Sequence, residues 1–519
     1  MLSFQLIQIW YNFNMKVYQT YQVRELDRIA IQEFGISGYS LMQRAGKAAL
    51  DVLLEHWSKA QSFIVVCGKG NNAGDGYVIA RLLHSQKFIV KILYVYEPKD
   101  LIGDALIAAQ ECIKNEIDIR PFSPKELLQA DVIIDALLGT GIKGEVQGEF
   151  KLAIEAINSS KIDVLAIDIP SGLNADTGNP LGAAIKASLT ITFVGLKQGL
   201  FTGKAKDFCG EIIFSNLDLP EEVFNRVTST VEVLTLNKLQ KQLPRRKRSA
   251  NKGAYGHVLV IGGDYGMVGA ARMAGIASAR VGAGLVTVAT RPEHIVAVSG
   301  ACPELMCYGI NNAEDLSKLI ERATVIIIGP GLGKSLWSKE LWQTAIVSRK
   351  PKIIDADGLN FLAITPRKDE NWILTPHPGE AGRLLNCSAI DIQHDRFSAI
   401  SKIQKSYHGV CVLKGSGSLV LGENNRIGIC TFGNPGMASG GMGDILSGVI
   451  GGLLAQGLSL EIAAKLGVMI HAKAGDSAAL EYGERGLLAT DLLFFYKNWL
   501  IDHQKCYKIA FYRANFSKT

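Results

Sequence analysis

The sequence lacks several features that would assign it to a special class of protein. It has no run of about 18 apolar residues, so no segment is expected to span a membrane. Its nine cysteines include no Cys-x-x-Cys pair, and most lie in apolar segments, which predicts reduced, buried thiols and a cytoplasmic location. The net charge is only +6, which gives no case for a nucleic-acid partner.

The first fourteen residues have neither the basic start nor the small-residue cleavage site of a signal peptide. Met15 opens a more ordinary start, MKVYQTYQVRELD. We therefore expect either Met1 or Met15 to be the true first residue, with the preceding segment a wrongly assigned start or an extension outside the fold.

The chain is long enough for two domains. Single cores stop growing near ~250–300 residues, and this chain has 519. A polar stretch opens at Pro220, and Leu243-Pro244 precedes a basic run at 245–248, which we interpret as a solvated linker. This composition predicts one domain over residues 15–235 and a second over residues 236–505.

Both halves alternate short apolar runs with segments of helical length, and the first half opens with two helices over residues 23–57. The apolar runs of the first half are residues 63–68, 88–95, 131–139, 163–172 and 189–195, and those of the second are 257–263, 285–290, 324–333, 352–359, 372–380 and 409–417. Runs rich in Val and Ile, separated by helices, are typical of parallel sheets covered on both faces. The fold class is therefore α/β, with a Rossmann-like three-layer αβα domain first and a different α/β domain second.

Three strand ends in the first half have polar side chains. A glycine-rich loop at 68–76 contains Asn71, Asn72 and Asp75, while Asp135 and Asp168 end two later strands. The carboxyl ends of parallel strands form one crevice, so these oxygens are expected to converge there. Amide, hydroxyl and carboxylate oxygens suit a hard cation.

The motifs CGKGNNAGDGYVIAR, DALLGTG and DIPSGLNADTG resemble those of the NAD(P)H-hydrate epimerases, over about residues 20–235. The resemblance implies that Asp168 acts as acid and base and that K⁺ is held by Asn72, Asp135 and Ser171. It also implies substrate contacts from Asp168 and from two loops, Asn71, Asn72, Ala73, Gly74, Asp75 and Gly139, Thr140, Gly141, Ile142, Lys143, Gly144, Glu145. Lys197 either assists this reaction or is a surface lysine that follows a strand.

In the second half, GNPGMASGGMGDILSG at residues 433–448 reads as a glycine-rich turn that opens a helix. Gly440, Gly441 and Gly443 would expose backbone N–H groups to a transferring phosphoryl group. Asp444 would accept a hydroxyl proton beside that anion hole. As the alternative, Asp444 would only cap the helix.

The GxGD pattern resembles the ribokinase-like fold. Together with NKGAYGHVLVIGG, GPGLG, TPHPGE and KGSGS, it resembles the ADP-dependent NAD(P)H-hydrate dehydratases over about residues 240–500, although Ser439 and Met442 stand where threonine is frequent. The resemblance implies Mg²⁺ with ADP at this site. The implied nucleotide contacts are Lys414, Gly415, Ser416, Gly417, Ser418 and Gly443, and the implied hydrated-cofactor contacts are Ala270, Gly331, His377 and Asp444. Asp355 and Asp357 are alternative metal or hydroxyl contacts, or turn formers.

The two resemblances together imply an enzyme of nicotinamide-nucleotide repair. The first domain would interconvert the R and S forms of hydrated NADH and NADPH. The second would dehydrate the S form while ADP becomes AMP and phosphate. A homo-oligomer is also expected.

Three other functions stay open from the residues. A kinase of a small alcohol would share GxGD and the anion hole but would leave the first half unexplained. A non-catalytic first half, acting as a binding module, would not need its oxygen-rich loops. A Rossmann dehydrogenase fits GKGNNA and Glu97 in the looser form of its fingerprint, but assigns no role to Asn72, Asp135 or Ser171.

Overall fold

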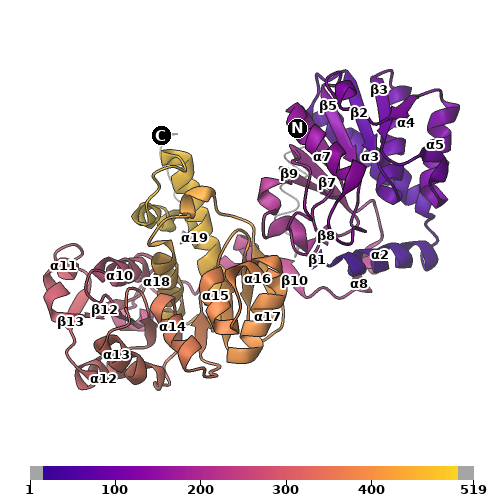
Figure 1. The fold of residues 1–519 in the computed structure, drawn as a ribbon. Helices are drawn as coiled ribbons and strands as arrows, with labels where there is room; N and C mark the ends of the chain where they lie inside the picture. Colours follow the sequence, from indigo (N-terminus) through magenta and orange to yellow (C-terminus); the bar gives the residue numbers. More distant parts are fainter. Residues whose placement is uncertain (1–15, 501–519) are drawn as a thin grey trace, which may run out of the picture. The chain divides into compact units, whose positions relative to one another are not determined.

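The computed structural model describes residues 16–500, and the choice between Met1 and Met15 lies outside them. The chain divides into two compact units, one ending at Val233 and one beginning at Leu234 (Figure 1). Among the described residues, no helix is long and apolar enough to cross a membrane.

The N-terminal unit is built on a seven-stranded sheet in the order β4-β3-β2-β5-β6-β7-β9, in which all neighbours are parallel. A smaller set has β1 between β10, which is antiparallel to it, and β8, which is parallel. The strands are β1 (Lys16–Tyr18), β2 (Ser62–Cys67), β3 (Ile89–Tyr94), β4 (Asp118–Pro121), β5 (Val132–Ala136), β6 (Asp163–Ile167), β7 (Leu189–Phe193), β8 (Leu196–Lys197), β9 (Glu211–Ser215) and β10 (Val231–Val233).

Both faces of this sheet are buried, because side chains alternate between them. Phe63 and Val65 of β2 join a core with the helices α2 to α5, whereas Ile64 and Val66 pack with α6 and α7. The longer helices are α2 (Thr20–Gln32), α3 (Gly38–His56), α4 (Asn71–Ser85), α5 (Gly103–Lys114) and α7 (Gly148–Ser160), and the shorter ones α6 (Pro124–Leu127) and α8 (Glu221–Asn225). The predicted three-layer αβα domain is confirmed.

The C-terminal unit has nine strands in the order β13-β12-β11-β14-β15-β16-β17-β18-β19. They are parallel through β17 and antiparallel in the last two pairs. The strands are β11 (His257–Ile261), β12 (Leu285–Thr290), β13 (Met306–Gly309), β14 (Val325–Ile328), β15 (Lys352–Ile354), β16 (Trp372–Leu374), β17 (Val410–Leu413), β18 (Ser418–Leu421) and β19 (Ile427–Cys430).

Helices cover both faces of this second sheet. Val258 and Val260 of β11 pack with α10, α18 and α19, while Leu259 and Ile261 are buried on the other face, where α12, α13 and α17 contact the sheet. The helices are α9 (Leu236–Gln240), α10 (Val268–Arg280), α11 (Ile295–Ser299), α12 (Ala313–Arg322), α13 (Leu336–Ile346), α14 (Ala356–Ile364), α15 (Pro378–Leu385), α16 (Ala389–His394), α17 (Arg396–Tyr407), α18 (Met442–Ala455), α19 (Leu460–Tyr482) and α20 (Tyr496–Leu500).

Every predicted apolar run contains a strand, but most of the strands end earlier than the run. The residues beyond Ala136 and Ile167, for example, belong to loops rather than to β5 and β6. These loops contain the polar residues of the candidate sites. The strands that the sequence did not predict lie at sheet edges, in the antiparallel hairpins or in the small β10-β1-β8 set, where the apolar pattern is short.

Helices α10 and α18 pack backbone to backbone. A Cβ atom on Gly448 would lie 2.2 Å from the Ala274 carbonyl oxygen, and the Ser278 hydroxyl donates a 2.9 Å hydrogen bond to the Gly448 carbonyl. This close approach determines where the first turns of both helices lie, and those turns contain Ala270 and Asp444.

Replacing Gly448 by alanine therefore tests how firmly the two helices are held. The added methyl group meets backbone that cannot move aside, so we expect the free energy of unfolding to fall by about 1–3 kcal/mol. Urea unfolding can be followed by tryptophan fluorescence, since Trp337, Trp342, Trp372 and Trp499 all belong to this unit.

The control is Gly269→Ala, also in α10, where a Cβ would meet nothing within 4 Å. Alanine there should leave stability unchanged or raise it by about 0.5–1 kcal/mol. Equal unfolding midpoints for the two variants would show that α10 and α18 are not in tight contact at Gly448.

Candidate active sites

The first site lies where the strand order of the N-terminal sheet reverses, between β2 and β5, the position at which open α/β sheets bind ligands. A cavity of about 1060 Å³ opens there. Of the two predicted substrate loops, all residues line it except Ala73, Gly74 and Gly144. Ala73 is buried, and a Cβ on Gly74 would collide with Met42. Gly144 has a left-handed backbone, with φ of 81°.

Asp168 reaches this cavity from the end of β6 through an unusual backbone. Its φ is 66°, a left-handed conformation that is costly for a residue other than glycine and is found at functional sites. Its Oδ1 accepts hydrogen bonds from Thr192 Oγ1 at 3.3 Å and from the Phe193 N–H at 3.2 Å. The neighbouring strand β7 thus holds the carboxylate in place.

Lys197 forms an ion pair with Asp168 Oδ1. Its side chain is only 1% exposed, and its Nζ also donates to Thr192 Oγ1 and to the Phe193 carbonyl, both at 2.9 Å. The interpretation of Lys197 as a surface lysine is therefore wrong. All the partners named here lie around Asp168, so its ammonium group is positioned to act on that carboxylate.

Two further carboxylates line the cavity around this pair. Burial, with the charges of Asp168 and Asp27, raises the pKa of Asp75 well above its ordinary value. Burial also raises the pKa of Asp27 to about 6, with the Lys197 charge opposing the shift and Asp168 adding to it. One ammonium group and three carboxylates in one cavity favour different protonation states for different carboxylates.

Asp27 is a site residue that the sequence analysis missed. It lies in α2 on the stripe of Val23 and Ala30, residues four before and three after it, which are buried. A carboxylate on the apolar face of an amphipathic helix was the available signal.

Of the residues predicted to hold K⁺, Asp135 and Ser171 contact each other, and Asn72 lines the cavity beside Gly139. Asp135 and Ser171 are fully buried, and Ser171 donates to Asp135 from its hydroxyl at 2.6 Å and from its backbone N–H at 2.8 Å. Asn72 is 6% exposed, and among the described residues neither its Oδ1 nor its Nδ2 has a hydrogen-bond partner. Burial raises the pKa of Asp135 to about 6, with the Ser171 bonds opposing the shift. The Oδ1 of Asn72, unpartnered among the described residues, and the buried carboxylate of Asp135 are oxygen atoms of the kind that binds a hard cation.

In the second site, α18 begins at Met442 and its N-cap is Gly441, with a left-handed φ of 91°. Asp444 therefore stands inside the first turn, and its interpretation as the helix cap is wrong. A Cβ on Gly443 would lie 3.1 Å from Lys414 Nζ, so the glycine turn and the lysine face each other.

Lys414 is the centre of a buried charge network. Its Nζ lies 2.7 Å from Asp355 Oδ1 and 3.7 Å from Glu380 Oε2. Burial, reinforced by the charge of Asp355 and opposed by that of Lys414, raises the pKa of Asp444 to about 7. A carboxylate with that pKa can take up and release a proton near neutral pH.

Asp355 has a definite role in this network. It is 1% exposed and accepts hydrogen bonds from Thr375 Oγ1 at 2.8 Å and Ser447 Oγ at 2.7 Å. It is therefore more than a turn former, because it anchors Lys414. Asp357 instead accepts a bond from the Gly333 N–H at 2.8 Å and so holds the GPGLG loop.

The predicted nucleotide segment forms the turn between β17 and β18. The Gly415 N–H donates to Ser418 Oγ at 3.3 Å, and the Ser418 hydroxyl donates to the Gly415 carbonyl at 3.0 Å, which closes the turn. Arg396 is 1% exposed and donates to the Leu413 and Lys414 carbonyls at 3.1 and 3.3 Å. Arg396 was not predicted from the sequence, and it fixes the backbone of this turn through these two hydrogen bonds.

The predicted contacts of the hydrated cofactor lie along the same edge of the sheet. Gly331 lies against Ala270, since a Cβ on Gly331 would be 3.1 Å from the Ala270 Cβ. Gly441 lies against Met273, which is about one helical turn after Ala270 in α10, and a Cβ on Gly441 would collide with the Met273 side chain. His377 caps α15, where its Nδ1 accepts a 2.9 Å bond from the Gly379 N–H, and its side chain is 52% exposed. The cap explains the position of His377 and leaves its outer face available to a ligand.

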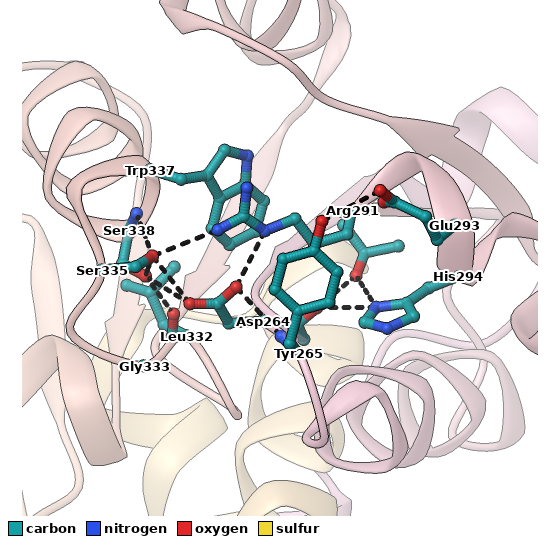
Figure 2. Close-up of polar contacts among 12 residues, drawn as sticks. Asp264, Tyr265, Arg291, Glu293, His294, Leu332, Gly333, Ser335, Trp337 and Ser338 are labelled. Carbon is teal, nitrogen blue, oxygen red and sulfur yellow. Dashed lines mark hydrogen bonds and ion pairs between the residues drawn. The ribbon is translucent and has the colours of Figure 1, made fainter.

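Next to Gly331, Asp264 collects several donors in a cluster shown in Figure 2. Its backbone N–H donates to the Gly331 carbonyl at 2.7 Å, and its carboxylate accepts from Arg291 Nε at 2.8 Å and Ser335 Oγ at 2.7 Å. The cluster ties the loops after β11, β12 and β14 together at the carboxyl edge of the sheet.

Known families match both units. The model described as YjeF-related protein N-terminus matches residues 38–199, and the model of the NAD(P)H-hydrate dehydratases matches residues 258–497. The C-terminal unit thus has the predicted ribokinase-like α/β fold. A kinase of a small alcohol, a non-catalytic first half and a Rossmann dehydrogenase do not account for this pair of matches.

Relatives match almost the whole chain. A bifunctional NAD(P)H-hydrate repair enzyme of Coxiella burnetii is 54% identical over 92% of this chain and 97% of its own length. One from Escherichia coli is 42% identical over 91% of both chains. Among solved structures, an ADP/ATP-dependent NAD(P)H-hydrate dehydratase from Bacillus subtilis is 26% identical over 51% of this chain and 96% of its own, with a TM-score of 0.47. On the full-length relatives, this chain belongs to the family of bifunctional NAD(P)H-hydrate repair enzymes.

Proposed function

We propose that the N-terminal unit interconverts the R and S forms of hydrated NADH and NADPH, and that the C-terminal unit dehydrates the S form at the expense of ADP. The observation on which this depends is the pair of separate sites, each with several buried carboxylates around one lysine. Both sites lie at strand carboxyl ends and have acid–base groups, as two proton-transfer reactions require.

Inversion at the hydroxyl-bearing carbon of the hydrated ring needs one group that gives a proton and one that takes it. Asp168, paired with Lys197, is the base in this proposal. Asp75 is available as the acid, because burial raises its pKa well above the ordinary value. Asp27, with a pKa of about 6, is present in both its protonated and its ionised form near neutral pH. The loops at residues 71–75 and 139–145 hold the substrate over this group.

To test this assignment, a mixture of both epimers of hydrated NADH is incubated with excess ADP and the full-length protein. Asp168→Asn keeps the shape of the side chain but removes its charge, so loss of the R epimer should slow by about 10²–10⁴-fold while loss of the S epimer is unchanged. Asp27→Asn should slow only the R epimer as well, and should remove an ionisation near pH 6 from the epimerisation profile.

Asp51→Asn, in a side chain that is 59% exposed on α3, is the control and should behave as wild type. If the R epimer still disappears at the wild-type rate with Asp168→Asn, when spontaneous epimerisation is slow, Asp168 is not the base. An unchanged pH profile for Asp27→Asn would remove Asp27 from the proton transfer.

Asn72, Asp135 and Ser171 are proposed to hold a K⁺ ion beside the substrate loop. Support comes from the buried amide of Asn72 and the buried carboxylate of Asp135, which together suit an oxygen-binding cation. Bound there, K⁺ would neutralise Asp135 and stabilise the loop that begins at Gly139. The described residues contain no cluster of three His, Cys, Asp or Glu side chains suited to a metal, so the amide and hydroxyl oxygens are essential.

Cation binding predicts local protection that does not depend on turnover. Hydrogen exchange of residues 132–147 should be slower in KCl than in N-methylglucamine chloride at equal ionic strength, because ligand binding stabilises the bound conformation. Asp135→Asn should abolish the difference, whereas Asp118→Asn, on the edge strand β4, should retain it. Identical exchange of the wild type in both salts would exclude a K⁺ site.

In the second site, the ring hydroxyl attacks the β-phosphorus of ADP while Asp444 takes its proton, and AMP leaves. Phosphate then leaves the ring carbon that held the hydroxyl group, the neighbouring ring carbon gives up a proton to the departing phosphate or to solvent, and the ring recovers the double bond of the dihydronicotinamide. Lys414 and the backbone N–H groups of the 440–443 turn stabilise the charge of the transferring group. Mg²⁺, held with ADP, would screen the phosphates.

The pKa of Asp444, raised to about 7 by burial, sets a pH dependence for this step. A base acts when deprotonated, so kcat/KM for the S epimer with ADP should fall about tenfold per pH unit below pH 7 and level off above it. Asp444→Asn should lower the rate by about 10²–10⁴-fold above pH 7, abolish this pH dependence and leave epimerisation unchanged. Wild-type turnover by Asp444→Asn would rule out this base.

A cytoplasmic location is part of the proposal, supported by the absence of disulfides among the eight described cysteines. The homo-oligomer expected from the family resemblance stays a prediction.

A further inference from the structure

An aromatic side chain is presented at the carboxyl edge of the C-terminal sheet, next to the predicted cofactor contacts. Tyr265 lies in the loop between β11 and α10, directly after Asp264, and is 58% exposed. Tyr265 lies outside the sequence motifs and outside the charge network around Lys414. Single exposed aromatic side chains are common on proteins, and Tyr265 differs from them in the number of neighbours that fix its ring.

Tyr265 is fixed on several sides (Figure 2). The Arg291 guanidinium lies 4.6 Å from the centre of its ring, and the ring of Trp337 lies 4.3 Å from the same guanidinium. The Tyr265 hydroxyl donates to Glu293 at 2.9 Å, and His294 makes an edge contact at 5.9 Å between ring centres. The exposed ring is thus the outer layer of a rigid stack of Trp337, Arg291 and Tyr265.

Arg291 is committed to this stack rather than available as a phosphate ligand. Its Nε donates to Asp264 at 2.8 Å, its Nη2 to Ser335 Oγ at 3.2 Å, and its side chain is 17% exposed. The Asp264 carboxylate neutralises the guanidinium. The surface that remains for a ligand is the aromatic ring, which suits a flat base rather than an anion.

The strand order gives the position of the stack relative to the reaction. Neighbouring strands lie about 4.8 Å apart. Asp355 follows β15, and Tyr265 follows β11, two strands away in one direction, so the two strand ends are about 10 Å apart. Lys414 and the nucleotide turn follow β17, two strands away in the opposite direction.

ADP and the hydrated dinucleotide must therefore extend in opposite directions from the Asp444 region. With ADP toward β17, the part of the dinucleotide beyond its hydrated ring extends toward β14 and β11, past Gly331 and Ala270. The end of that molecule is an adenine base, and bases stack on aromatic side chains.

We propose that Tyr265, backed by Arg291 and Trp337, is the stacking platform for the adenine base of the hydrated dinucleotide. This inference rests on the dehydratase function proposed above and adds a subsite to it. Since Arg291 is neutralised, the platform binds the base and does not distinguish hydrated NADH from hydrated NADPH.

The test combines a truncated side chain with a truncated substrate. Tyr265→Ala should raise KM for the S form of hydrated NADH and of hydrated NADPH about tenfold, with kcat and the KM for ADP unchanged. Tyr265→Phe should stay within about twofold of wild type, since it keeps the ring. With hydrated reduced nicotinamide mononucleotide, which has no adenine, Tyr265→Ala and wild type should give equal KM values.

The matched control is Tyr21→Ala, an exposed tyrosine (65%) of α2 in the N-terminal unit. An unchanged KM for hydrated NADH in Tyr265→Ala overturns the platform. So does an equal rise with the mononucleotide, which would place the ring against the nicotinamide or indicate a distorted loop, and so does a rise in the KM for ADP. If the wild type shows no ADP-dependent dehydration, the proposed function itself fails, which distinguishes that result from failure of the platform.

Discussion

The parallel arrangement of the strands is the constraint on which both sites depend. In a parallel sheet all carboxyl ends lie at one edge, so loops far apart in sequence meet there. Asn72 and Asp168 follow two different strands of the first sheet, and Asp135 lies near the carboxyl end of a third. Asp264, Asp355 and Lys414 follow three strands of the second. Because helices cover both faces of each sheet, this edge is the place where polar groups can gather.

Both sites use the same electrostatic device. A lysine is buried among several carboxylates, Lys197 in the first site and Lys414 in the second. A buried charge is costly unless paired, so each lysine forms an ion pair with one carboxylate, while burial raises the pKa of neighbouring carboxylates. Asp444 near neutral pH and Asp75 well above its usual range are the result. Burial is the main cause of both raised pKa values, and the charge of the lysine opposes it.

The precision of the second site comes from helix packing. Gly448 lets α18 approach α10 at the distance of backbone contact, and this aligns the turn containing Asp444 with the one containing Ala270. Larger side chains at this contact would move Asp444 away from Ala270. The Trp337–Arg291–Tyr265 stack then extends the same edge outward, beyond the last predicted contact.

The sequence by itself determined the α/β class, the central parallel strands of both sheets and the loops that contain Asn72, Asp168 and Asp444, because apolar runs and glycine-rich turns are local signals. Only the tertiary structure decided which groups meet. Lys197 could be read as a surface residue, and Asp27 and Arg396 as ordinary helix residues, until the fold brought them against Asp168 and the nucleotide turn. Their contacts join residues distant in the chain, and helical spacing reveals only that Asp27 lies on the apolar face of its helix, not what it meets there.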